Sequence, residues 1–168
     1  MKLQQIDKAR YRKHLNRVLA ACIGALVLGS LGIARLLIIA FPSASGSHFH
    51  WNLLGVIITC AAIALVLKRV QHHPYLREVL YVWHLKQALN QITRRLRKIK
   101  AAAEQGNVEA MHALQFNYSG SRQLWQLDDN TITMDELALE QAKLDTLAER
   151  YQVEPSAERY HSSTLKQF

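Results

Sequence analysis

The sequence predicts an all-α integral membrane protein, in which a hairpin of two transmembrane helices is followed by a cytoplasmic helical bundle or coiled-coil-like domain. Most of the apolar content lies in two runs, 18–41 and 51–67, that contain a single charge between them. After the second run, apolar residues recur at helical spacing. The length of 168 residues leaves room for one ordinary domain beside such a hairpin.

The two apolar runs are long enough to span a bilayer. As a helix, 18–41 reaches roughly 36 Å, which exceeds a hydrocarbon core of about 30 Å. The second run is shorter, and its flanking aromatic and basic residues are typical interfacial anchors, so the predicted spans are 18–41 and 49–69. Arg35 lies close enough to the helix end to snorkel, with a functional intramembrane charge as the alternative.

The distribution of Lys and Arg predicts the topology. Six basic residues and one acid precede Val18, whereas the connecting loop 42–48 carries no Lys or Arg. Basic residues return after the second span, so both termini are expected on the cytoplasmic side and the loop on the periplasmic side. Two alternatives remain: a pair of buried core helices in a soluble protein, and a cleavable signal peptide ending near Ser43-Ala44-Ser45.

We divide the chain into four segments on this basis. They are a basic cytoplasmic N-terminal segment (1–17), the transmembrane hairpin (18–70), a cytoplasmic helical domain (71–152) and a flexible tail without apolar periodicity (153–168).

A heptad stripe predicts one helix that begins at Pro74 and ends near Gly106. Its members are Val82, Leu85, Leu89, Ile92, Leu96, Ile99 and Ala103. The stripe faces either another helix of the same chain or the same helix of a second subunit.

Two further helices are expected. Asn107 is the N-cap candidate of a helix that continues to about residue 127, with a break or kink at Gly120. Thr133 and Glu136 form a capping box at the start of a third helix. The acidic residues of that third helix, Glu140 among them, are expected to face mostly outward.

Small residues at four-residue spacing let two transmembrane helices approach closely. Together with part of the heptad stripe they make up the candidate helix-packing residues. These are Ala21, Ala25, Gly29, Gly55, Thr59, Leu85, Leu89, Ile92, Leu96 and Ile99.

We expect no catalytic site, no cofactor and no metal site. The sequence lacks P-loop, dinucleotide-binding, nucleophile-elbow and zinc-protease motifs. The His48/His50 and His72/His73 pairs have no third ligand nearby in the sequence, and the cysteines lack CxxC spacing.

The strongest local charge is a basic cluster, for which an anion or a protein partner is the expected ligand. Its members are Arg94, Arg95, Arg97, Lys98 and Lys100. Residues 68–100 carry nine basic residues and one acidic residue, whereas 101–168 carry five and eleven. The cluster therefore either pairs with the chain's own acidic helix or binds anionic lipid or nucleic acid.

Three segments resemble an uncharacterised bacterial family of small two-span inner-membrane proteins. They are IDKARYRKHLNRV (6–18), HPYLREVLYVWHLKQALNQI (73–92) and GSRQLWQLDDNTITMDEL (120–137). The resemblance implies the bacterial inner membrane and carries no activity or site residues.

The leading functional hypothesis is a non-enzymatic interaction or scaffold component that acts through its cytoplasmic helices. Its expected partners are the lipid bilayer and either a second copy of the chain or another membrane protein, while nucleic acid is not favoured. The alternatives are a sensor of anionic lipid or nucleic acid through 94–100, and a small accessory subunit of a transporter or secretion complex.

Overall fold

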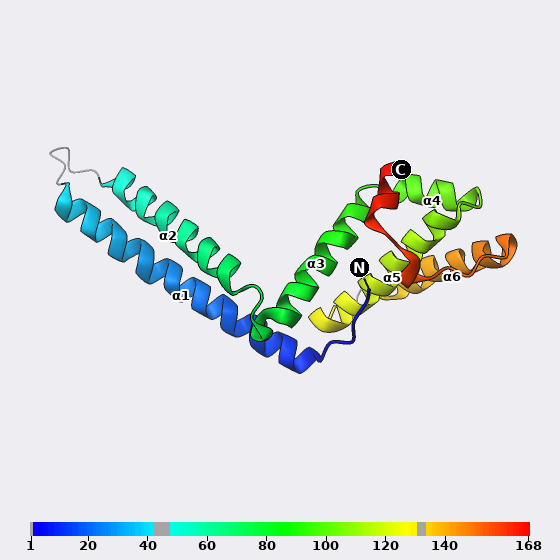
Figure 1. Ribbon diagram of the computed structural model, residues 1–168, viewed down its shortest axis with the longest axis horizontal. Coiled ribbons are helices and arrows are strands. Elements are labelled where there is room, and N and C mark those ends of the chain that lie inside the picture. Colours follow the sequence, from blue (N-terminus) through cyan, green and yellow to red (C-terminus); the bar gives the residue numbers. More distant parts are fainter. Residues whose placement is uncertain (1, 42–47, 131–133) are drawn as a thin grey trace. The chain divides into compact units, whose positions relative to one another are not determined.

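The computed structural model describes residues 2–41, 48–130 and 134–168, and the regular elements in these ranges are all helical (Figure 1). The all-α prediction is confirmed. The predicted loop, apart from His48, and the predicted N-cap Thr133 lie outside the described residues. In chain order the elements are α1 Lys8–Ala40, α2 Phe49–Val70, η1 Pro74–Leu76, α3 Arg77–Thr93, α4 Leu96–Glu104, α5 Val108–Asp128, α6 Met134–Tyr151, η2 Ala157–Arg159 and η3 Ser162–Gln167.

The chain divides into two compact units. The hairpin unit is Ala9–Leu80, and the helical unit comprises Met1–Lys8 and Tyr81–Phe168. The hairpin unit is thus larger than the predicted hairpin at both ends, because basic residues before Val18 and the first residues after α2 belong to it.

Helices α1 and α2 are both long and apolar enough to cross a membrane. Only 6% of the most apolar window of α1 and 11% of that of α2 are buried within the protein. Side chains such as Leu28 and Ile39 are 76% and 75% exposed. The apolar side chains of α1 and α2 are therefore mostly uncovered, whereas a core helix of a soluble protein has its apolar face covered by other elements.

Helix α1 begins at Lys8, well before the predicted span, because its first turns have packing partners. Tyr11 is 2% exposed, and the His14 ring stacks on Tyr75 with ring centroids 3.9 Å apart. Glu78 is buried and forms an ion pair with Arg10, while its second oxygen lies 3.6 Å from His14 Nδ1. These contacts hold the basic end of α1 in a helical conformation.

The predicted single helix from Pro74 to Gly106 is instead two α-helices after a short 3₁₀ turn. Helix α3 ends at Thr93, and α4 begins at Leu96 after a break at Arg94 and Arg95. The heptad stripe continues across the break, since Ile92 and Ile99 are both fully buried. The buried apolar residues of this unit come from α3, α4, α5, α6 and the tail, so the stripe packs within the chain.

Helix α5 follows a well-defined turn. Gly106 has a φ of 85°, and the Asn107 side chain accepts a hydrogen bond from the Ala110 backbone N–H at 3.0 Å. The predicted stop and N-cap are therefore confirmed. Gly120 does not break α5: a Cβ there would lie 3.0 Å from Leu89 Cδ2 and 3.1 Å from Leu85 Cδ1, so glycine allows close packing against α3.

The tail 153–168 differs from the flexible segment expected from the sequence. Tyr160 is 2% exposed and stacks on Phe116 with ring centroids 4.6 Å apart, and Leu165 is 4% exposed. The Ser156 backbone N–H donates to His112 Nδ1 at 3.0 Å. Isolated apolar residues on or between short 3₁₀ turns show no helical periodicity, which explains why the pattern did not indicate packing.

Candidate functional site: a basic hollow on the helical unit

The break between α3 and α4 exposes basic side chains. The Arg94 backbone N–H donates to the Asn90 carbonyl at 3.1 Å, and the Arg95 backbone N–H donates to the Ile92 carbonyl at 2.9 Å, so the backbone tightens at the end of α3. Arg94, Arg95, Arg97 and Lys98 are all exposed.

These four side chains line a shallow hollow of about 340 Å³, which we call the basic hollow. Its lining residues are Arg94, Arg95, Arg97, Lys98, Lys166 and Phe168. The Arg95 guanidinium donates to the Leu165 carbonyl, which brings the tail to the edge of the break. Lys166 thus joins the predicted cluster from a segment remote in sequence.

The chemistry of the basic hollow is that of an anion site. Five of its six lining residues are cationic, and the lining set includes no Asp or Glu. Guanidinium groups bind carboxylate and phosphate through paired N–H donors, and a concentration of one charge sign raises the local density of counter-charged ligands.

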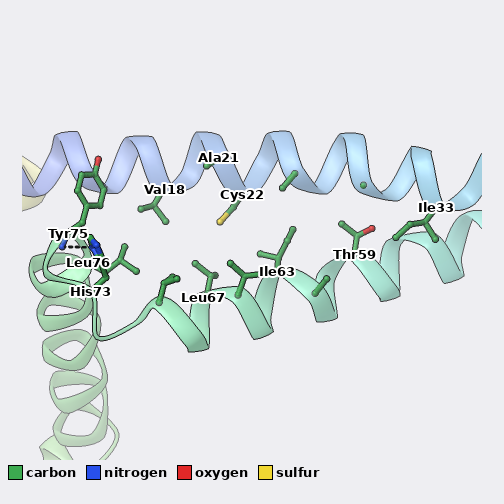
Figure 2. Close-up of a pocket in the computed structure, with 15 residues that line it drawn as sticks. Val18, Ala21, Cys22, Ile33, Thr59, Ile63, Leu67, His73, Tyr75 and Leu76 are labelled. Carbon is green, nitrogen blue, oxygen red and sulfur yellow. Dashed lines mark hydrogen bonds between the residues drawn. The ribbon is translucent and has the colours of Figure 1, made fainter.

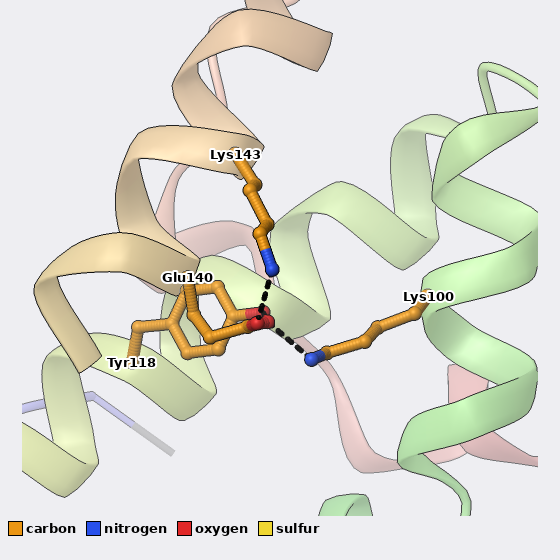
Figure 3. Close-up of polar contacts among 4 residues, drawn as sticks. All are labelled: Lys100, Tyr118, Glu140 and Lys143. Atoms are coloured by element: carbon orange, nitrogen blue, oxygen red, sulfur yellow. Dashed lines mark hydrogen bonds and ion pairs between the residues drawn. The ribbon is translucent and has the colours of Figure 1, made fainter. Parts of the chain in front are cut away.

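Lys100, the fifth predicted member, belongs to a different cluster (Figure 3). Its ammonium group pairs with Glu140 of α6, whose other oxygen accepts from Lys143 at 2.9 Å. The Tyr118 hydroxyl donates to Glu140 at 3.2 Å. The expectation that the basic cluster pairs with the acidic helix therefore holds for Lys100, and Glu140 faces inward rather than outward.

Electrostatics in this Glu140 cluster follow from the contacts. Hydrogen bonds from Lys100 and then Lys143 lower the pKa of Glu140 to about 2. Burial, and then the neighbouring Glu140 carboxylate, raise the pKa of Tyr118. The cluster joins α4, α5 and α6 through one carboxylate that stays ionised at neutral pH, which is the behaviour of a structural connection.

The predicted small residues lie where α1 and α2 face one another, and Figure 2 shows Ala21 and Thr59 on the facing sides of the two helices. Gly29 lies against Thr59, since a Cβ on Gly29 would be 2.7 Å from Thr59 Cγ2. Gly55 lies against the α1 backbone, whereas Ala21 and Ala25 line a groove between the helices. Gly29 and Thr59 line the same groove at the point where the helices meet.

The predicted packing residues of the second unit lie mainly in its core. Leu85, Leu89, Ile92 and Ile99 are buried, and Leu96 is half-buried at the first position of α4.

Within the ranges that the structure describes, no group of three or more His, Cys, Asp or Glu side chains is placed to hold a metal ion. Cys22 is half-buried and Cys60 is exposed, and both are free thiols. His48 and His50 lie at the start of α2, and His73 caps η1 by accepting from the Tyr75 backbone N–H at 3.2 Å.

A family model described as a protein of unknown function, DUF3087, matches residues 1–165. The chain belongs to the DUF3087 family. Neither a curated protein nor a solved structure shows significant similarity to this chain. Membership in DUF3087 assigns no activity to the chain.

Sequence reasoning missed the contribution of the tail to this DUF3087 protein. Lys166 lines the basic hollow, and the Leu165 carbonyl accepts from Arg95. The signals present in the sequence were Tyr160, Leu165 and Phe168, three large side chains in a mostly polar segment.

Proposed function

We propose that this DUF3087 protein is a non-enzymatic interaction component of the bacterial inner membrane, which binds an acidic protein partner through its basic hollow. The observation that carries the proposal is the convergence of five cationic side chains, from the break after α3, from α4 and from the tail, around one hollow. An acidic peptide segment supplies several carboxylates at spacings that such a surface can pair simultaneously.

Membrane insertion is supported by the exposure of the apolar helices. If the protein were soluble, α1 and α2 would present long apolar surfaces to water, with 6% and 11% of their most apolar windows covered. The Lys and Arg asymmetry around the spans supports cytoplasmic termini and a periplasmic loop.

The heptad stripe favours an external partner over self-association through α3 and α4. Leu85 and Ile99 are fully buried within the unit, so the stripe has no face left for a second copy. The break between α3 and α4, in contrast, leaves a concentration of positive charge exposed on the surface of the helical unit.

A matched pair of double variants tests the proposed partner binding. Crosslinking and affinity purification of the full chain from native membranes would compare R94Q/R97Q with R122Q/R150Q, which removes the same charge from exposed positions outside the hollow. We expect an acidic protein to co-purify with the wild type and with R122Q/R150Q, and to be lost from R94Q/R97Q.

Three results would overturn the proposal. Equal recovery of the partner with both double variants would show that the hollow is not the binding surface. A monomer recovered without any partner would remove the interaction role. Salt-sensitive binding of vesicles or duplex DNA that R94Q/R97Q abolishes, with no protein partner, would indicate a lipid or nucleic-acid ligand instead.

Topology has its own test. In a C22S/C60S background, S45C is expected to react with a membrane-impermeant maleimide in intact cells, and S163C only after lysis. Reaction of S163C in intact cells would reverse the proposed orientation.

A further inference from the structure

An apolar groove of about 660 Å³ separates part of α1 from α2 within the hairpin unit (Figure 2). The residues that line it include Val18, Ala21 and Ala25 of α1, Leu67 and Val70 of α2, and Tyr75 of η1. The volume falls within the range of roughly 300–1,000 Å³ that small-molecule sites occupy. The groove is large enough for a ligand, and its walls are almost entirely hydrocarbon.

The shape of the groove follows from side-chain size. The helices are in contact where Gly29 meets Thr59 and Gly55 meets Ala34. Toward η1 they separate, and Ala21 and Ala25 remain exposed because their side chains are too short to bridge the gap. An unfilled gap of this size forfeits the dispersion contacts that a packed interior provides, so a hydrocarbon ligand gains them on entering.

One end of the groove is closed by a short wall. Tyr75 and Leu76 of η1 line this end, and Tyr75 is held in place by its stacking on His14. The groove therefore has a defined end. The lining residues on α1 run from Val18 to Ile33, about 22 Å along the helix, which is longer than one leaflet of a hydrocarbon core about 30 Å thick.

Cationic side chains flank the same end. Arg17 precedes the lining residue Val18, and Lys68 and Arg69 lie between the lining residues Leu67 and Val70. All three are exposed. A lipid whose acyl chain lies in the groove would place its phosphate at this level, where basic residues near the membrane surface attract anionic lipid.

We propose that the groove between α1 and α2 holds one acyl chain of an anionic glycerophospholipid from the cytoplasmic leaflet, with the lipid phosphate bound near Arg17, Lys68 and Arg69. The inference rests on the membrane insertion proposed above and is independent of the basic hollow. The depth of the groove, its hydrocarbon walls and the cations at its closed end together favour a lipid over a second helix.

The first test uses the full chain purified in mild detergent and analysed by native mass spectrometry. We expect one anionic phospholipid to remain bound per chain. A21L/A25L fills the groove and is expected to lose the bound lipid, whereas A20L makes one such Ala-to-Leu change at an exposed position outside the lining and is expected to retain it.

A second variant set keeps the test informative if A21L/A25L fails to fold. R17Q/K68Q/R69Q changes only exposed side chains, so its helicity by circular dichroism is expected to match the wild type. When supplied with mixtures of phosphatidylglycerol and phosphatidylcholine, it is expected to lose the wild-type preference for the anionic lipid by about tenfold.

The proposal is overturned by three outcomes. One is a wild-type chain that carries no lipid, and another is equal lipid occupancy in folded A21L/A25L and A20L. The third is a dimer that A21L/A25L disrupts, which would make a second copy the occupant. Release of the wild type from membranes by alkaline carbonate would instead refute membrane insertion itself. This result distinguishes a failure of the membrane proposal from a failure of the lipid-binding proposal.

Discussion

Gly55 packs against the backbone of Ser30, so that a Cβ atom on Gly55 would lie 2.8 Å from the Ser30 carbonyl oxygen. The same atom would lie 3.0 Å from the Ala34 backbone nitrogen. Backbone atoms of a helix cannot move aside as a flexible side chain can. Helices α1 and α2 can therefore approach this closely at residue 55 only because that residue is glycine.

Substitution G55A is expected to lower the stability of the hairpin unit by about 1–3 kcal/mol, because the added methyl group forces the helices apart. Unfolding of the full chain by sodium dodecyl sulfate, followed by circular dichroism, would measure the change. Gly24 and Gly32 are matched controls on α1, since a Cβ at either would meet nothing within 4 Å. A loss in G24A or G32A equal to that in G55A would contradict the prediction.

Substitution G106A is expected to destabilise the turn between α4 and α5. The φ of 85° at Gly106 disfavours a residue with a side chain, and a Cβ would lie 2.7 Å from Tyr151 Cε1. We expect a loss of about 1–3 kcal/mol, measured by thermal unfolding in mild detergent. In a Y151A background the clash with the ring is absent and only the backbone strain remains. The loss of stability caused by G106A is therefore expected to be smaller in Y151A than in the wild type. An unchanged melting temperature in G106A would refute this account.

The Glu140 cluster predicts a loss of stability in acid. The pKa of Glu140 is lowered to about 2 in the folded protein, so the carboxylate contributes stability above its unfolded pKa of 4.5. That contribution is lost as the pH falls from about 4.5 toward 2. E140Q is expected to remove about 1–2 kcal/mol at neutral pH and to flatten the stability profile in this window.

Glu136, exposed on the same helix, offers the comparison for E140Q. Chemical denaturation of E136Q between pH 7 and 2.5 is expected to follow the wild type. If E140Q and the wild type lost stability in parallel over that range, another group would be responsible for the acid sensitivity.

His112 predicts that the tail detaches at mildly acidic pH. Burial chiefly lowers the pKa of His112, opposed by Glu109 and assisted by Arg159. The neutral ring accepts the Ser156 N–H, so its stabilising contribution is present above the unfolded pKa of 6.5 and is lost as the pH falls through the lower folded pKa. Hydrogen exchange at 156–168, corrected for intrinsic rates, is expected to accelerate below pH 6.5.

Substitution H112N keeps an acceptor for Ser156 and does not titrate, so its tail is expected to exchange at a pH-independent corrected rate. H84N, at an exposed histidine of α3, serves as the control and is expected to behave like the wild type. Acid-dependent exchange that persists in H112N would assign the effect to a different residue.

The break at Arg94 and Arg95 shows where sequence patterns were insufficient. Arginine favours helices, and neither Gly nor Pro marks the position, so local propensity predicts one continuous helix. The heptad stripe is also unbroken across it. The two helices are separated because α5 packs against α4 as well as approaching α3 at Gly120, and a bend lets Ile92 and Ile99 both reach that core.

The sequence predicted that the candidate site is basic, but it did not predict which residues form the site. A run of basic residues is visible in any sequence, and the cluster at 94–100 was identified on that ground. Lys100 does not line the basic hollow because it pairs with Glu140 of α6. Lys166 does line the hollow because the tail packs beside the break. Both changes depend on contacts between segments far apart in the chain.

The sequence alone determined the helical class and the two apolar helices, because both follow from local periodicity and from hydrophobicity over a window of neighbouring residues. It also determined the turn at Gly106 and Asn107, where backbone conformation and capping are local properties. Only the tertiary structure decided that the heptad stripe is buried internally, that the tail packs against Phe116, and that α1 and α2 separate to leave a groove. Each of these features depends on the distance between two surfaces that are far apart in the sequence. That distance is determined by the volumes of the side chains between the surfaces and by how closely the helices approach.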